Sequence, residues 1–100
     1  MPAYLFVNIH QVVDEPKMEE YRKGVFATVA QYGGKYLVIG GSTDLLEGNW
    51  RPTFPVVIEF PSMKQARAWY DSPEYKPLLK LRLEATRGDA IFVEGLDVPR

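Results

Sequence analysis

The first apolar pattern in the chain has a period of two. From Ala3 to Ile9 the odd positions carry Ala, Leu, Val and Ile, while the even positions begin with Tyr4 and Phe6 and continue with Asn8 and His10. Because successive side chains of a strand point to opposite faces, this alternation predicts a strand over residues 3–12. One face of that strand is aliphatic, and the other changes from aromatic to polar.

The apolar period changes to three and four after Asp14, which predicts a helix. Asp14 is a favourable N-cap, and Pro16 is tolerated in a first helical turn. Gly33-Gly34 then ends the helix, because glycine adopts a positive φ at little cost. The apolar positions at helical spacing are Met18, Tyr21, Val25, Val29 and Tyr32.

The remaining elements follow from similar signals. Ser62 and Gln65 have the spacing of a capping box that begins a second helix, and Ser72-Pro73-Glu74 carries the signals of a helix restart. Strands are predicted at 35–39, 54–60 and 90–94, with a loop at 42–53. The order β-α-β-β-α-β is typical of a single ferredoxin-like α+β domain over residues 1–100, in which a four-stranded antiparallel sheet carries two helices on one face.

The sheet face away from the helices is expected to be partly apolar. If Leu5, Val7, Ile9, Val56, Ile58 and Phe60 pack under the helices, the other face holds Tyr4, Phe6, Asn8, His10, Val57, Glu59, Phe92 and Glu94. An apolar patch on an open sheet indicates a protein partner. A second copy packed sheet against sheet about a twofold axis is the simplest solution, so we expect a homodimer.

Composition and charge exclude several functions. The 100 residues carry a formal charge of −1 without a basic stripe, so neither nucleic acid nor an anionic membrane surface is an expected partner. No cysteine and a single histidine exclude thiol chemistry and a His-rich metal site, and we expect neither metal nor cofactor. No apolar run approaches the length of a membrane span, and the first residues lack signal-peptide features, so we expect a cytoplasmic protein.

Several short motifs together resemble one known family. They are Gly33-Gly34, Gly40-Gly41, Leu46-Glu47-Gly48-x-Trp50-Arg51-Pro52, Glu59-Phe60-Pro61-Ser62, Trp69-Tyr70-x-Ser72-x-Glu74-Tyr75 and Arg82. Nearly the whole chain resembles domain of unknown function 1330, of the dimeric α/β-barrel superfamily. The resemblance implies a ferredoxin-like homodimer, and the superfamily includes cofactor-independent monooxygenases and muconolactone-isomerase-like enzymes. It implies no particular activity for this family.

His10 and Glu59 are the candidate catalytic pair. The first and third strands are neighbours in this fold, so Glu59 and His10 can share the open face. A buried carboxylate beside an imidazole orients the ring and favours its protonated form, as general acid–base chemistry requires. The alternative is a structural pair at the dimer interface, or a Glu59 paired with Arg51 or Arg82.

Asn8, Trp50 and Arg51 are the candidate ligand-binding residues. Asn8 could orient a polar ligand group, while Trp50 offers a flat apolar wall and Arg51 a clamp for a carboxylate. The alternative is that Trp50 fills the end of the barrel and Arg51 pairs with Glu47 or Glu59.

Two functions therefore remain open. One is a small-molecule-binding homodimer that acts as a cofactor-independent enzyme on a small acidic or aromatic metabolite. The other is a non-catalytic structural or regulatory dimer with a filled interface. An open cleft of a few hundred Å³ between the sheet and the 42–53 loop would favour the first.

Overall fold

The computed structural model describes residues 1–97 and confirms the expected order of strands and helices. The elements are β1 (Ala3–Val12), α1 (Glu15–Gln31), β2 (Lys35–Ile39), β3 (Pro55–Phe60), α2 (Met63–Tyr70), α3 (Lys76–Ala85) and β4 (Thr86–Glu94). The second helical segment is thus divided into α2 and α3. No helix of the described residues is long and apolar enough to cross a membrane.

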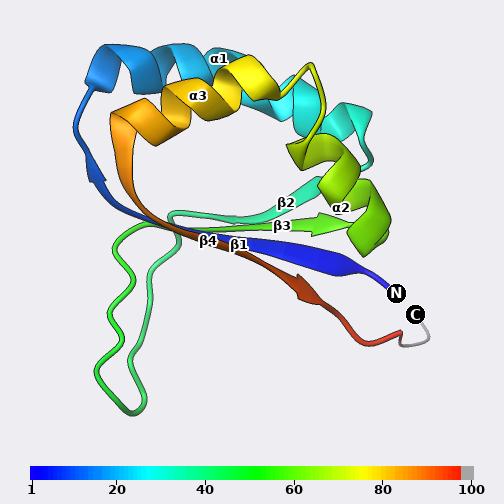
Figure 1. Cartoon of the computed structure of the whole chain (residues 1–100). Coiled ribbons are helices and arrows are strands. Elements are labelled where there is room, and N and C mark those ends of the chain that lie inside the picture. The colour runs from blue at the N-terminus through cyan, green and yellow to red at the C-terminus, as the bar shows by residue number, and fades with distance from the viewer. Residues whose placement is uncertain (98–100) are drawn as a thin grey trace.

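The four strands form one antiparallel sheet in the order β2-β3-β1-β4. All three helices cover the same face of this sheet, and the other face is left without a covering layer (Figure 1). This is the ferredoxin-like α+β fold that the element order predicts.

Side-chain caps fix where the helices begin. The Asp14 carboxylate accepts a hydrogen bond from the Lys17 backbone N–H at 3.1 Å, and the Ser62 hydroxyl accepts one from the Gln65 N–H at 3.0 Å. Ser72 also caps, accepting from the Tyr75 N–H at 3.1 Å, but α3 begins only at Lys76. The expected helix restart at 72–74 is therefore a capped turn, and the helix follows it.

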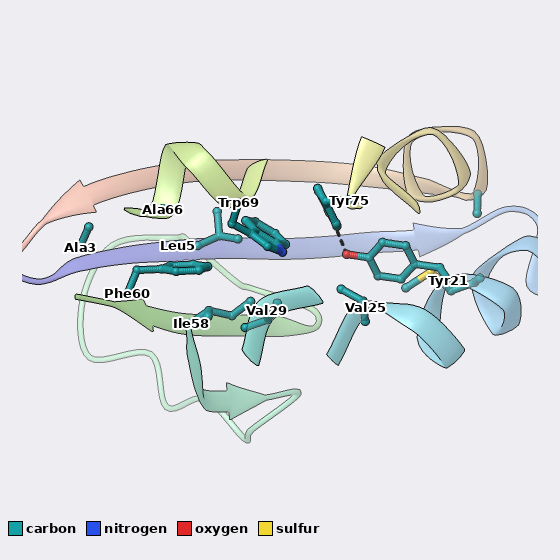
Figure 2. Packing of buried hydrophobic residues seen from close by; sticks show 12 residues of the cluster. Ala3, Leu5, Tyr21, Val25, Val29, Ile58, Phe60, Ala66, Trp69 and Tyr75 are labelled. Carbon is teal, nitrogen blue, oxygen red and sulfur yellow. Dashed lines mark hydrogen bonds between the residues drawn. The ribbon is translucent and has the colours of Figure 1, made fainter. Parts of the chain in front are cut away.

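The core lies between the helices and the sheet. The Trp69 indole is almost fully buried there, with its ring centroid 5.4 Å from that of Phe60 and 4.0 Å from that of Tyr75 (Figure 2). Its Nε1 donates a hydrogen bond to the Thr28 hydroxyl at 3.1 Å, so the indole's one polar atom is satisfied inside the core. Replacing such a side chain with Ala costs about 3–5 kcal/mol, which makes Trp69 a principal link between α2 and the sheet.

The register of β4 corrects one expectation about the open face. Phe92 lies opposite Leu5 and Glu94 opposite Ala3, so both belong to the face that the helices cover. The Phe92 ring contacts Tyr70 of α2, with ring centroids 5.9 Å apart. The apolar residues of β4 on the open face are instead Ile91 and Val93. The strand also begins at Thr86, four residues before the expected start.

Residues 41–54, here called the arm, connect β2 to β3 without regular structure and extend away from the helices (Figure 1). The backbone turns away from β2 at Gly40, whose φ of +63° favours glycine. The Gly40 N–H donates a hydrogen bond to the Pro55 carbonyl at 2.7 Å. Near the tip, Leu46 is 89% exposed and Trp50 is 73% exposed. The arm therefore presents apolar side chains beyond its own sheet.

Candidate functional site

A cavity of about 120 Å³ lies between the helices and the sheet. Its walls are mostly aliphatic side chains of β1, β3 and α1, closed at the inner end by Trp69 and Tyr75. The exposed residues among its lining mark a mouth between α1 and β2, and these are Arg22, Phe26, Ile39 and Phe54. The cavity is therefore an apolar pocket that opens to solvent at one side.

Three polar side chains in the pocket wall are linked by consecutive hydrogen bonds. The hydroxyls of Tyr21 and Tyr75 lie 2.9 Å apart in a hydrogen bond, drawn as a dashed line in Figure 2. Arg82 of α3 donates from Nε to the same Tyr75 hydroxyl at 3.3 Å. All three residues are buried, and helix α1 supplies one of them while the segment around α3 supplies the others.

Arg82 has no carboxylate partner among residues 1–97. Its bond to Tyr75 is the hydrogen bond that its side chain makes there, and none of the ion pairs within that range includes it. No fully buried side-chain nitrogen or oxygen of those residues lacks a partner. The two terminal nitrogens of Arg82 therefore keep some contact with solvent, and Arg82 lines the pocket.

Burial raises the pKa of two tyrosines that line the pocket. Desolvation, reinforced by the neighbouring Tyr75, raises the pKa of the Tyr21 hydroxyl well above its ordinary value. Burial likewise raises the pKa of Tyr36, whose ring packs against Phe26 near the pocket mouth. The Tyr21 and Tyr36 hydroxyls therefore act as neutral hydrogen-bonding groups, and Arg82 supplies the positive charge.

A second polar cluster lies on the open face. Asn8 is buried and accepts through Oδ1 from the backbone N–H groups of Thr53 and Phe54, at 3.0 and 2.9 Å. Its Nδ2 lies 3.3 Å from Nδ1 of His10, and Nε2 of His10 lies 3.0 Å from the Asp89 carboxylate. Asn8 thus ties the arm to the sheet, and the histidine has a carboxylate partner from β4.

The structure does not bring His10 and Glu59 together, and the predicted contact between them is wrong. Glu59 lies opposite Tyr4 in the β1–β3 register and accepts a hydrogen bond from the Tyr4 hydroxyl at 2.9 Å. His10 is six residues beyond Tyr4 on β1, which corresponds to about 20 Å along the strand. The two strands are neighbours as expected, but their antiparallel register places these side chains at opposite ends.

Trp50 and Arg51 lie on the arm, outside the pocket under the helices. Trp50, Asn8 and Asp89 border a hollow of about 390 Å³ on the open face, which also involves Phe6 and Ile91. The expected cleft between the sheet and the arm is therefore open in the single chain. Trp50 is 73% exposed in the single chain, and Arg51 makes no ion pair within residues 1–97.

The sequence interpretation missed the pocket residues Tyr21, Tyr75 and Arg82. Tyr21 was expected on the apolar face of the first helix, Tyr75 was named as part of a family motif, and Arg82 was considered as a motif residue and as an alternative partner of Glu59. A signal was present, because Tyr75 and Arg82 are seven residues apart and so lie on the same side of a helical segment. No group of three or more potential metal ligands occurs within residues 1–97.

The fold and this pocket define a ferredoxin-like α+β protein with an apolar cavity between its helices and its sheet. The chain belongs to the family described as domain of unknown function (DUF1330), whose model matches residues 2–96. No curated protein matches the chain.

Solved structures are similar to this chain in fold. A Rhodopseudomonas palustris protein of unknown function is 16% identical with a TM-score of 0.72, covering 97% of this chain and 84% of that one. A dimeric ferredoxin-like protein of unknown function from Jannaschia sp. CCS1 is 12% identical with a TM-score of 0.65, covering 95% and 100%. SnoaB from Streptomyces nogalater, described as a cofactor-independent oxygenase, is 12% identical with a TM-score of 0.57, covering 97% and 93%.

Proposed function

We propose that this protein is a homodimer that binds a small molecule in the pocket between its helices and its sheet. We further propose that it acts there as a cofactor-independent enzyme on a small acidic or aromatic metabolite. The observation that carries the proposal is the apolar pocket of about 120 Å³ with a connected Tyr21–Tyr75–Arg82 chain in its wall.

The size and lining of the pocket support ligand binding. A dry apolar cavity of about 150 Å³ accommodates a benzene molecule, so this pocket suits a ligand of about one ring. Ligand sites are mostly apolar with a few polar groups that fix orientation, and that description fits this pocket. A guanidinium and neutral hydroxyls in a water-poor site also stabilise negative charge that develops on a bound oxygen during a reaction.

The open face supports the homodimer. Phe6, Ile91 and Val93 lie there on the neighbouring strands β1 and β4, with exposed fractions of 42%, 58% and 38%, on the face that no helix covers. A patch of this kind favours a partner, and a second copy buries the same patch on both chains. The Jannaschia protein is described as dimeric, and SnoaB as a cofactor-independent oxygenase, which agrees with both parts of the proposal.

A thermal-shift screen tests ligand binding. The full chain is screened with small single-ring acids and neutral single-ring compounds, and we expect some of them to raise the unfolding midpoint, because a ligand that binds the native state stabilises it. Val25→Phe places a larger side chain in the pocket and should abolish the shift. Val13→Phe makes the same change at an exposed position outside the pocket and should preserve it. If no compound shifts the wild type, or if the shift survives Val25→Phe, the pocket is not the ligand site.

The catalytic roles of His10 and Glu59 stay predictions. His10, if it acts, does so with Asp89 and Asn8 as its neighbours, on the face where the second copy is proposed to pack.

A further inference from the structure

Arg82 is unusual because it is buried and has no opposite charge within the described chain. It is 9% exposed, and its one side-chain hydrogen bond within residues 1–97 is to the neutral hydroxyl of Tyr75. Two more exposed arginines do have carboxylate partners: Arg22 pairs with Glu15 at 2.8 Å, and Arg67 with Asp71 at 3.2 Å. Of these three arginines, Arg82 is therefore the most buried, and it is the one without a carboxylate partner within residues 1–97.

Burying a cation without an opposite charge is unfavourable. A guanidinium removed from water loses its hydration, and a single hydrogen bond to a phenol restores a small part of that loss. An anion that enters the pocket would supply the missing opposite charge and hydrogen-bond acceptors for the terminal nitrogens. A guanidinium also presents paired N–H groups that match the two oxygens of a carboxylate.

The walls of the pocket restrict the shape of such an anion. The Trp69 and Tyr75 rings are inclined by 32° with centroids 4.0 Å apart, and both line the pocket. Aliphatic side chains of β1 and β3 form much of the remaining wall. The two rings stack on each other, and this aromatic end of the pocket together with a volume near that of one ring favours a planar ligand over a branched or extended one.

We infer that the pocket selects a small planar anion, a single ring that carries one anionic oxygen group such as a carboxylate, with Arg82 as its charge partner. The Tyr75 hydroxyl holds the guanidinium in position, so Tyr75 is a positioning residue. This inference rests on the proposed pocket and adds the charge and shape of its ligand.

The test compares two probes that differ in charge. Benzoate and benzamide have nearly the same size and shape, but only benzoate is negatively charged near neutral pH. Each is titrated into the isotopically labelled full chain, and affinity is read from the backbone amide resonances of residues that line the pocket. We expect the wild type to bind benzoate at least about tenfold more tightly than benzamide.

Two variants assign that preference to Arg82. Arg82→Met removes the charge and should lower benzoate affinity to the level of benzamide, while benzamide affinity stays within about twofold. Arg82→Lys retains the charge without the paired N–H geometry and should keep part of the preference. Arg67→Met is the matched control outside the pocket. Because Arg67 does not line the pocket and is already paired with Asp71, its removal should leave the preference unchanged.

Each other outcome has a definite meaning. If both probes bind the wild-type pocket with equal affinity, the inference about charge is wrong and the proposed pocket stands. If Arg82→Met keeps the preference, or if Arg67→Met removes it as well, Arg82 is not the charge partner. If neither probe perturbs the pocket residues, both the inference and the proposed pocket fail.

Discussion

Arg82 and Tyr75 are joined by a 3.3 Å hydrogen bond from the guanidinium Nε to the phenol oxygen, inside the pocket between the helices and the sheet. Because Tyr75 also bonds to Tyr21 at 2.9 Å, the guanidinium is held against two neutral hydroxyls. Its terminal nitrogens remain available for another molecule. A packing defect in a core is not expected to contain a charge, so this relationship supports the proposal that the cavity is a binding pocket.

Arg82→Met should not destabilise the protein without ligand. Replacing a buried charge that lacks an opposite charge with an apolar side chain of similar volume removes its desolvation penalty. We expect the free energy of unfolding to stay the same or to rise by about 1–2 kcal/mol, measured by chemical denaturation. A fall of more than about 1 kcal/mol would show that Arg82 stabilises the fold itself, and that its charge is compensated within the protein.

Ile91→Lys should dissociate the dimer and leave the chain folded. Ile91 is 58% exposed on the open face and lies opposite Phe6, within the proposed interface. A lysine there places two like charges near each other across a twofold axis. Leu83→Lys is the control, because Leu83 is equally exposed, at 58%, but lies on α3. Sedimentation equilibrium should give a dimer for the wild type and for Leu83→Lys, and a single chain for Ile91→Lys. A wild type that is monomeric at micromolar concentration contradicts the interface.

Alkaline pH should reveal the buried Tyr21 hydroxyl. Its folded-state pKa is raised by burial, so above about pH 10 the unfolded chain loses this proton while the folded chain retains it. The stability contributed by Tyr21 is thus fully present below its unfolded pKa and is lost as pH rises from there through the folded value. In Tyr21→Phe we expect a loss of about 1 kcal/mol at neutral pH, from the hydrogen bond to Tyr75.

The difference between wild type and Tyr21→Phe is therefore expected to shrink above about pH 10. Urea unfolding at a series of pH values measures it, and other ionising groups contribute equally to both proteins. A difference that stays constant through this range would mean that Tyr21 is not shielded from water.

His10 should respond to Asp89 and be indifferent to Glu59. Its ring nitrogen lies 3.0 Å from the Asp89 carboxylate, whereas Glu59 is bonded to Tyr4 at the other end of the strand. Asp89→Asn should shift the ring resonances of His10 in an NMR spectrum, and Glu59→Gln should leave them in place. The reverse result would restore the His10–Glu59 pair and contradict the observed register.

The fold could be predicted from the sequence because its signals are local. The alternation from Ala3 to Ile9 and the caps at Asp14 and Ser62 act within a few residues, and the structure contains the elements that they indicate. The face of Phe92 could not be predicted in this way. It depends on which residue of β4 lies opposite Leu5, and a shift of one position moves every side chain to the other face.

The candidate site was harder to predict because it depends on contacts that are distant in the sequence. Because β1 and β3 are adjacent, His10 and Glu59 would be neighbours if the strands paired in a suitable register. The observed register pairs Glu59 with Tyr4 instead. Arg82 was difficult for a different reason. The sequence does not show which side chains from α1, α3 and the sheet surround it, so it could not show that Arg82 has no carboxylate partner within residues 1–97.

The most direct test of this account locates a bound ligand. Nuclear Overhauser effects are measured between the ring protons of benzoate and the side chains of the wild-type protein. The account predicts contacts to Val25, Ile58 and Tyr75, which line the pocket under the helices. Contacts to Phe6, Trp50 and Ile91 would instead place the ligand in the hollow on the open face and contradict the account.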